Sequence, residues 1–247
     1  MEITILSFSL GILLLALPLY ILYYYRINLW RKLARSFLKM LIITALTALF
    51  LKYIIELNNT FVNILWCLLM SVAASATIIV KARLHLRKFL LPVFAGVTIG
   101  SLTTTLYLLL LSLGVKNAID AHFLIPILGL LIGNMITVNS NALGAYYSGM
   151  SYHAQLYSFL IGNGATHAEA SRYLVRRSIE KTALPNIAHM GGMIISSSPV
   201  IMWAMILNGT NVTIAAAVQL LLITAMFCSS IVSTAVTLWI YQRSSFN

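Results

Sequence analysis

Three polar side chains at helical spacing lie inside a long hydrophobic run of this sequence. Asn134, Thr137 and Asn141 follow one another at intervals that place them on one face of a helix. Polar side chains are costly inside a bilayer and often mark the route of a substrate or ion. The pattern therefore favours a polar path along this segment. Hydrogen bonds that only hold helices together would need the same residues, so both interpretations stay open.

A run of three serines gives the next hydrophobic segment a second polar patch. Ser196, Ser197 and Ser198 stand directly before Pro199. A proline inside a membrane helix can break the helix and free backbone carbonyls, which are suitable groups for a cation. We expect these serines to share a polar path with the asparagine-containing segment.

Two methionines of the same segment, Met193 and Met202, add thioether groups to this candidate path. Thioethers suit soft metals such as Cu(I), although a methionine in a membrane helix more often fills space between side chains. The five acidic residues all lie at the ends of hydrophobic runs or in connections, so we do not expect a tight site for a hard cation within the bilayer. The identity of any metal stays open.

A charged helix is predicted in the polar region between two hydrophobic runs. Thr166 followed by Glu169 is a capping box, in which the two side chains satisfy free amides at the start of a helix. The helix should begin at His167, and Pro185 lies just past its expected end.

A glycine turn at Gly162 and Gly164 separates this helix from a shorter one expected at about 152–161. Two short helices with such a turn resemble the coupling element with which membrane subunits of ABC transporters contact their ATPase. An amphipathic hairpin resting on anionic lipid would have the same composition, and both interpretations stay open. The residues expected to contact an ATPase are Gly162, Gly164, Ala165, Thr166, Glu169, Arg172 and Arg176.

The composition of the chain indicates the kind of fold that must position these polar residues. Of its 247 residues 60% are hydrophobic and only 9% are charged, whereas soluble domains carry about 25% charged residues. We expect an all-α, polytopic transmembrane helical bundle that forms one domain over residues 1–247, with a coupling segment at about 148–186. The predicted spans are about seven in number and cover roughly 3–25, 40–57, 60–80, 89–114, 123–147, 187–207 and 213–241.

Basic residues are distributed very unevenly over the connections. Fourteen of the 16 Lys and Arg residues fall on one side of a seven-span arrangement, and Lys52 and Lys116 alone fall on the other. The positive-inside rule then places the N-terminus outside and the C-terminus in the cytoplasm. The same placement accounts for the net charge of +11 without a nucleic-acid partner.

One pair of glycines offers a packing motif. Gly96 and Gly100 form a GxxxG match in the fourth predicted span, which allows close approach of two helices. Packing within one subunit is favoured over a dimer contact. Because the two halves of the chain show no convincing repeat, symmetry would have to come from a second copy or a related partner.

The chain resembles the FetB-like permeases, membrane subunits of bacterial ABC transporters associated with iron export and related to plant aluminium-tolerance permeases. The resemblance covers most of the sequence and is strongest over about 125–209. It is carried by Leu51-Lys52-Tyr53-Ile54, by Ile125-Pro126, Gly129 and Gly133-Asn134-Met135, by Gly164-Ala165-Thr166, Ala170-Ser171, Arg176, Ser178-Ile179 and Ala183-Leu184-Pro185, and by Pro199, Met202 and Gly209. One departure is Ser158-Phe159-Leu160-Ile161, which lacks the acidic residue that the family tends to have before the glycine turn.

The resemblance implies a multi-pass permease of the cell (inner) membrane that exports a metal ion such as iron. Its partners would be a second permease copy and a cytoplasmic ATPase subunit, which would hold ATP and Mg. No Walker A sequence or hydrolase signature occurs, so we expect no enzymatic site and no cofactor bound by this chain itself. The alternatives are an ATP-independent channel or carrier for a small solute, and an assembly subunit that does not transport.

Overall fold

The computed structural model describes residues 10–195 and 198–245, and all regular elements in these ranges are helices. Five of the described helices are long and apolar enough to cross a membrane. This confirms the expected all-α transmembrane bundle. The chain divides into two compact units, residues 1–57 and 58–247, which are called the N-terminal unit and the C-terminal unit below.

The N-terminal unit contains α2 (Ala16–Tyr24) and α3 (Trp30–Leu57). The described part of the first predicted span is the apolar stretch Leu10–Tyr24, which is shorter than the other spans. The helix of the second span begins at Trp30 rather than at residue 40, so basic residues expected in a connection lie on the first turns of α3. Arg and Lys are good helix formers, and their long stems can cover apolar surface while the charge stays in water.

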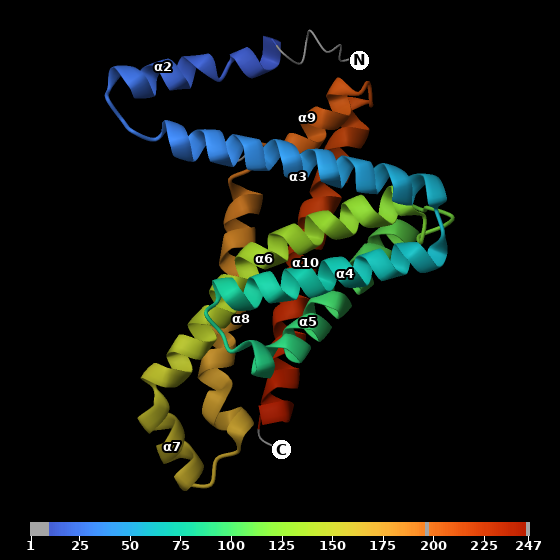
Figure 1. Cartoon of the computed structure of the whole chain (residues 1–247). Coiled ribbons are helices and arrows are strands. Elements are labelled where there is room, and N and C mark those ends of the chain that lie inside the picture. Colours follow the sequence, from blue (N-terminus) through green and yellow to red (C-terminus); the bar gives the residue numbers. More distant parts are fainter. Residues whose placement is uncertain (1–9, 196–197, 246–247) are drawn as a thin grey trace. The chain divides into compact units, whose positions relative to one another are not determined.

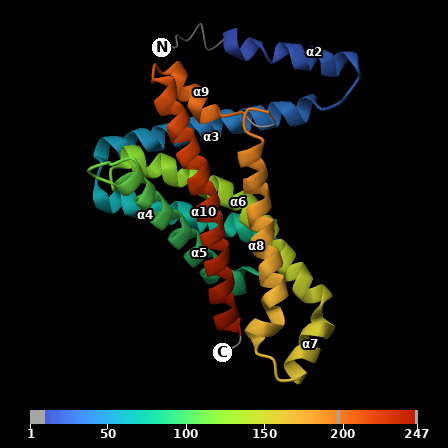
Figure 2. The same ribbon diagram turned by 180° about the vertical axis from the view of Figure 1, so that it is seen from behind.

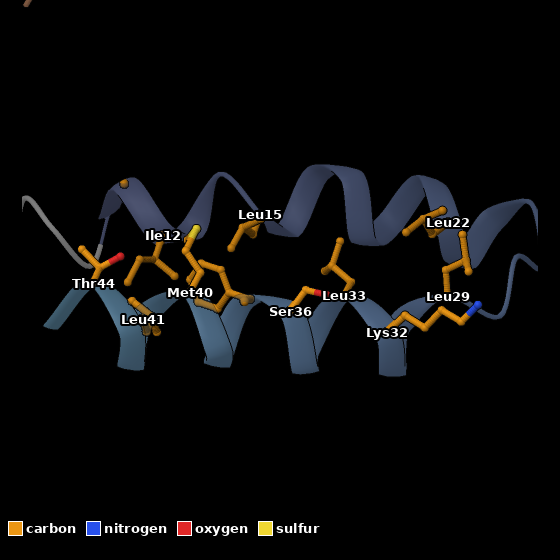
Figure 3. A pocket seen from close by; sticks show the side chains of 12 residues that line it. Ile12, Leu15, Leu22, Leu29, Lys32, Leu33, Ser36, Met40, Leu41 and Thr44 are labelled. Carbon is orange, nitrogen blue, oxygen red and sulfur yellow. The ribbon is translucent and has the colours of Figure 1, made fainter. Parts of the chain in front are cut away.

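An apolar groove of about 930 Å³ lies between the two helical stretches of the N-terminal unit. In Figure 3, Ile12 and Leu15 extend into it from one side, and Leu33 and Met40 extend into it from the other. The two stretches thus face each other across a groove lined mainly by apolar side chains.

The C-terminal unit contains four long apolar helices, all visible in Figure 1. They correspond to four predicted spans: 60–80 is α4 (Thr60–Lys81), 89–114 is α5 (Leu86–Tyr107) with the π-helical turn η1 (Leu108–Ser112), 123–147 is α6 (Ala121–Tyr152), and 213–241 is α10 (Val212–Ser245). The main core lies among α4, α5 and α6, where Ile78, Val93, Leu128 and Met135 are fully buried. The same core continues to Leu174 of α8 and Leu238 of α10, so these helices pack around one shared centre.

The two glycines of the GxxxG motif lie against α10 of the same chain. A Cβ atom added at Gly96 would approach the Thr237 hydroxyl and the Ser233 carbonyl oxygen, the latter at 2.6 Å, and one added at Gly100 would lie 2.8 Å from the Ser229 carbonyl oxygen. Only glycine permits this approach of backbones. The motif therefore serves packing within one subunit, as expected.

The charged helix, α8 (His167–Gly191), begins where the sequence predicts and ends later than predicted. Pro185 lies inside it, which corrects the expected end. Proline removes one backbone hydrogen bond of a helix, but bonds on both sides of it hold α8 in place. The Asn186 amide donates to the Thr182 carbonyl at 3.0 Å, and the Thr182 hydroxyl lies 3.0 Å from the Thr234 hydroxyl of α10.

The sixth predicted span, 187–207, is not one continuous helix. Its first residues form the end of α8, and its last residues form the short helix α9 (Val200–Leu207), with Pro199 as the N-cap. Pro199 was expected to break a helix, and the break lies between Gly191 and Val200. Figure 2 shows α8 running beside α10 and α6, so the later part of the segment expected at about 148–186 packs against these two long helices.

Candidate functional site

A cluster of hydrogen-bonded side chains joins α6, α8 and α10, and Asn134 lies at the centre of this cluster. The Asn134 amide donates to the Asn186 side-chain oxygen at 2.9 Å and to the Ser230 hydroxyl at 3.0 Å. Asn134 therefore reaches two helices at once, and its side chain is half-buried.

A second asparagine extends this cluster along α10. The Asn139 amide donates to the Ser233 hydroxyl at 2.8 Å, and the Thr234 hydroxyl donates to the Asn139 oxygen at 3.2 Å. Asn139 is only 1% exposed. The polar seam, as we call this cluster, consists of Asn134, Asn139, Ser178, Thr182, Asn186, Ser230, Ser233 and Thr234.

Sequence reasoning missed the members of the polar seam on α8 and also those on α10, which are Ser230, Ser233 and Thr234. Ser178, Thr182 and Asn186 recur every four residues, a signal that is visible in the sequence. All three are buried, and the Ser178 hydroxyl donates to the Ala142 carbonyl of α6 at 3.0 Å. Because hydroxyl and amide groups pair with one another here, the polar seam binds three helices together in an apolar setting.

The other two members of the predicted stripe do not join the polar seam. Thr137 and Asn141 are exposed, as are Gly133 and Ser148 on the same helix. Between Leu124 and Ser151, α6 exposes no large apolar side chain. We call Gly133, Thr137, Asn141 and Ser148 the outer face of α6. The exposed side chains of this face are small or polar, whereas other described spans expose leucine, isoleucine or phenylalanine.

A hollow of about 480 Å³ adjoins the outer face of α6. It is lined by Asn141, Gly144, Ala145 and Ser148 of α6 and by Lys181, Leu184 and Pro185 of α8. Within the described ranges, the Asn141 side chain makes no hydrogen bond. Asn141 is exposed and belongs to the predicted span 123–147, so its amide would need water or another polypeptide as a partner, because hydrocarbon offers none.

The described serine and methionine residues of the candidate path lie in α9 and in the connection that precedes it. Ser196 and Ser197 lie outside the described residues, and Ser198 is exposed. Met193 and Met202 are half-buried, Met193 in the connection after α8 and Met202 in α9, where its backbone N–H donates to the Gln219 side chain at 3.1 Å. Over residues 10–195 and 198–245, no three His, Cys, Asp or Glu side chains gather in a metal-binding group.

The predicted hairpin is present as α7 (Ala154–Gly162) followed by α8. Gly164 has a φ of +88°, the left-handed conformation that favours glycine, and no atom would lie within 4 Å of a Cβ at Gly162. Both glycines are exposed, and Ala165 beside them is half-buried. The tip of the hairpin is therefore an open turn with small side chains.

The capping box at the start of α8 is confirmed. The Thr166 backbone N–H donates to the Glu169 carboxylate at 2.8 Å, and the Glu169 N–H donates to the Thr166 hydroxyl at 3.3 Å. The Thr166 hydroxyl also donates to this carboxylate at 2.8 Å. The two bonds that the carboxylate accepts from Thr166, with a smaller contribution from the Arg172 charge, lower the pKa of Glu169 below its usual value. Arg172 and Arg176 are exposed one turn apart on α8, so both can meet a partner.

Two contacts connect the base of the hairpin to the bundle. The Gln242 amide of α10 donates to the Ser171 hydroxyl at 2.8 Å. Leu174 packs so closely on α6 that a Cβ at Gly149 would lie 2.7 Å from its side chain. A displacement of the hairpin would therefore reach α6 and α10 directly.

Comparison with known proteins gives one match. A profile of the uncharacterised protein family UPF0014 matches residues 5–246. No curated protein and no solved structure matches the chain.

Proposed function

The chain belongs to the uncharacterised protein family UPF0014, and from this membership and the shape of the α7–α8 hairpin we propose that it is the membrane subunit of an ABC-type transporter. The family indicates a membrane protein of the permease kind. The proposed location is the inner membrane, with the hairpin in the cytoplasm. A separate ATPase subunit would bind ATP and Mg, since no nucleotide-binding motif occurs in the sequence.

The observation that carries this proposal is the connection between an exposed tip and the bundle. The tip carries two glycines in an open turn, and exposed arginines follow on α8. At its base, Ser171 and Leu174 contact α10 and α6. Such an element can receive a push from an ATPase and pass it to the transmembrane helices.

The exposed polar groups of α6 support a path outside the polar seam. The polar seam is closed by its own hydrogen bonds, whereas Thr137 and Asn141 turn outward beside a hollow. We place the path along the outer face of α6, completed by the same face of a second copy. The cargo would be a metal ion such as iron, as the resemblance implies.

The docking proposal is tested by changing the tip without changing its fold. Ala165→Glu adds a negative charge at the tip and leaves the left-handed Gly164 unchanged, whereas Ser151→Glu adds the same charge at the end of α6. Each variant is co-expressed with its ABC ATPase subunit and purified. We expect Ala165→Glu to lose the ATPase and Ser151→Glu to retain it. Equal recovery of the ATPase with both variants would contradict docking at the tip.

The cargo is tested separately in proteoliposomes that contain the purified complex. We expect ATP hydrolysis to rise when iron is supplied on the cytoplasmic side, and to change less with other metals or organic solutes. Equal rates for all metals would remove iron as the cargo. Transport that proceeds without any ATPase would instead favour an ATP-independent channel or carrier.

A further inference from the structure

A basic hollow of about 600 Å³ lies at the end of the C-terminal unit where α10 terminates. Three helices line it: α5 with Arg87, Lys88, Leu91 and Pro92, α6 with Met150, and α10 with Tyr241 and Ser244. The hollow combines two cations and two hydroxyl groups with an apolar wall. It is separate from the polar seam, from the outer face of α6 and from the hairpin tip.

The two cations of the basic hollow are placed where their charge is not compensated. Arg87 and Lys88 lie in the first turn of α5, which contains no acidic residue. The start of a helix carries partial positive charge, so cations there are unfavourable and an anion is stabilised. Within residues 10–195 and 198–245, the ion pair that forms joins Lys52 and Glu56. Neither Arg87 nor Lys88 therefore has an acidic partner in the described part of the chain.

Tyr241, which lines the basic hollow, belongs to an aromatic stack, and a cation–π pair lies near the same end of α10. Phe89 stacks on Tyr241 with ring centroids 4.2 Å apart, and the Arg243 guanidinium lies 4.3 Å from the centre of the Trp239 ring. Aromatic and basic side chains at the end of a transmembrane helix are typical of the headgroup level of a bilayer. We therefore expect the basic hollow to lie at the depth of the lipid phosphates.

The apolar wall continues from the cations toward the hydrocarbon region. Leu91 stands one helical turn beyond Arg87 on α5 and is 68% exposed. Met150 is half-buried on the opposing helix. A ligand that fills the hollow would thus meet positive charge at one end and apolar side chains at the other.

We propose that the basic hollow binds an anionic phospholipid, with its phosphate at Arg87 and Lys88 and the start of an acyl chain against Leu91 and Met150. A basic pocket between transmembrane helices is a known arrangement for anionic headgroups. The site would fasten α5, α6 and α10 together at the end that carries the hairpin. The assignment does not depend on an ATPase or on the nature of any cargo.

The test measures lipid retention by the purified full-length protein. The protein is delipidated, incubated with phosphatidylglycerol or phosphatidylcholine, and examined by native mass spectrometry. Arg87→Gln with Lys88→Gln removes both cations of the hollow. The matched control, Arg31→Gln with Lys32→Gln, removes the same charge from another basic segment of the chain.

We expect the native protein to retain phosphatidylglycerol in preference to phosphatidylcholine. The Arg87→Gln/Lys88→Gln variant should lose about tenfold or more in phosphatidylglycerol affinity, because each charge-assisted contact contributes strongly, whereas the control should change by less than about twofold. An equal loss in both variants would show diffuse attraction and overturn the site. Equal retention of the two lipids by the native protein would do the same.

Two further measurements keep the proposal testable. Ser244→Trp fills the hollow from the end of α10 and leaves both cations in place, so it should also reduce phosphatidylglycerol binding even if the double variant fails to fold. Inorganic phosphate supplies the same anionic group without acyl chains. Full displacement of the lipid by millimolar phosphate would identify a free-anion site and overturn the assignment to lipid.

Discussion

Asn134 of α6 and Asn186 of α8 are joined by a hydrogen bond of 2.9 Å between their side-chain amides. This bond brings the end of a charged helix into the apolar bundle beside the middle of a long span. The Asn186 amide also donates to the Thr182 carbonyl, and the Asn134 amide also donates to the Ser230 hydroxyl. The Asn134 amide nitrogen and both polar atoms of the Asn186 side chain are thus paired, so the pair stabilises the approach of α6 and α8.

The first prediction concerns the strength of this pair. Asn134→Ala, Asn186→Ala and the double variant form a double-mutant cycle, read from the free energy of unfolding in mild detergent. Polar pairs in membrane bundles couple by about 0.6 kcal/mol on average and up to about 1.7 kcal/mol, and we expect a coupling in that range. Thr137→Ala on the exposed side of α6 should couple to neither. Fully additive effects of the two asparagine changes would contradict the pairing.

Local signals of the sequence were reliable in the hairpin. The capping box depends on residues three positions apart, so Thr166 and Glu169 alone predict the start of α8. The end of α8 could not be predicted in the same way. A local rule places it before Pro185, but contacts of Thr182 and Asn186 with distant helices carry α8 past the proline.

In the candidate path too, local spacing predicted which residues share a helix face but not which of them contact other helices. Helical spacing groups Asn134 with Thr137 and Asn141, yet the structure gives Asn134 to the polar seam and leaves the other two exposed. At about 100° per residue these three positions fall within an arc of about 60°, with Asn134 at one edge of it. Which part of that arc meets α8 depends on the packing of whole helices, which spacing does not encode.

The second prediction concerns the close contact of α5 with α10. Gly100→Ala places a methyl group about where the Ser229 carbonyl oxygen and the Ser233 side chain already lie. Overpacking of this kind costs about 1–3 kcal/mol, and we expect a loss of that size in the free energy of unfolding. Gly133→Ala on α6 is the matched control, because no atom lies within 4 Å of its added Cβ. A loss of stability as large in Gly133→Ala would contradict the assigned contact.

The third prediction concerns the outer face of α6. If a second copy covers it around a twofold axis, identical residues near that axis lie close together. In a chain with Cys67 and Cys228 replaced by alanine, Thr137→Cys should form a disulfide between two copies under mild oxidation in membranes. Leu69→Cys on the exposed side of α4 is the control and should stay monomeric on non-reducing gels. A cross-link through Leu69→Cys but not through Thr137→Cys would contradict the proposal that the outer face of α6 meets a second copy.

The fourth prediction concerns the pH dependence of the start of α8. Hydrogen bonds from Thr166 to the Glu169 carboxylate lower the pKa of Glu169 in the folded hairpin. A carboxyl group whose folded pKa is lowered contributes stability above its unfolded pKa, which is about 4.3 for glutamate. That contribution decreases as the pH falls below this value and is lost once the pH passes the lowered folded pKa, because the protonated group no longer favours the folded state.

Hydrogen exchange of the backbone amides of Thr166 and of residues 169–171, corrected for intrinsic rates, measures this effect in the full-length protein. We expect protection to fall between pH 6 and pH 3 in the native chain. Glu169→Gln keeps a side chain that can accept from the Thr166 N–H but cannot titrate in this range, so its protection should be lower at pH 6 and nearly constant with pH. If Glu169→Gln showed the same pH dependence as the native chain, another group would have to cause it, since the Glu169 carboxylate is the acidic group in the first turn of α8.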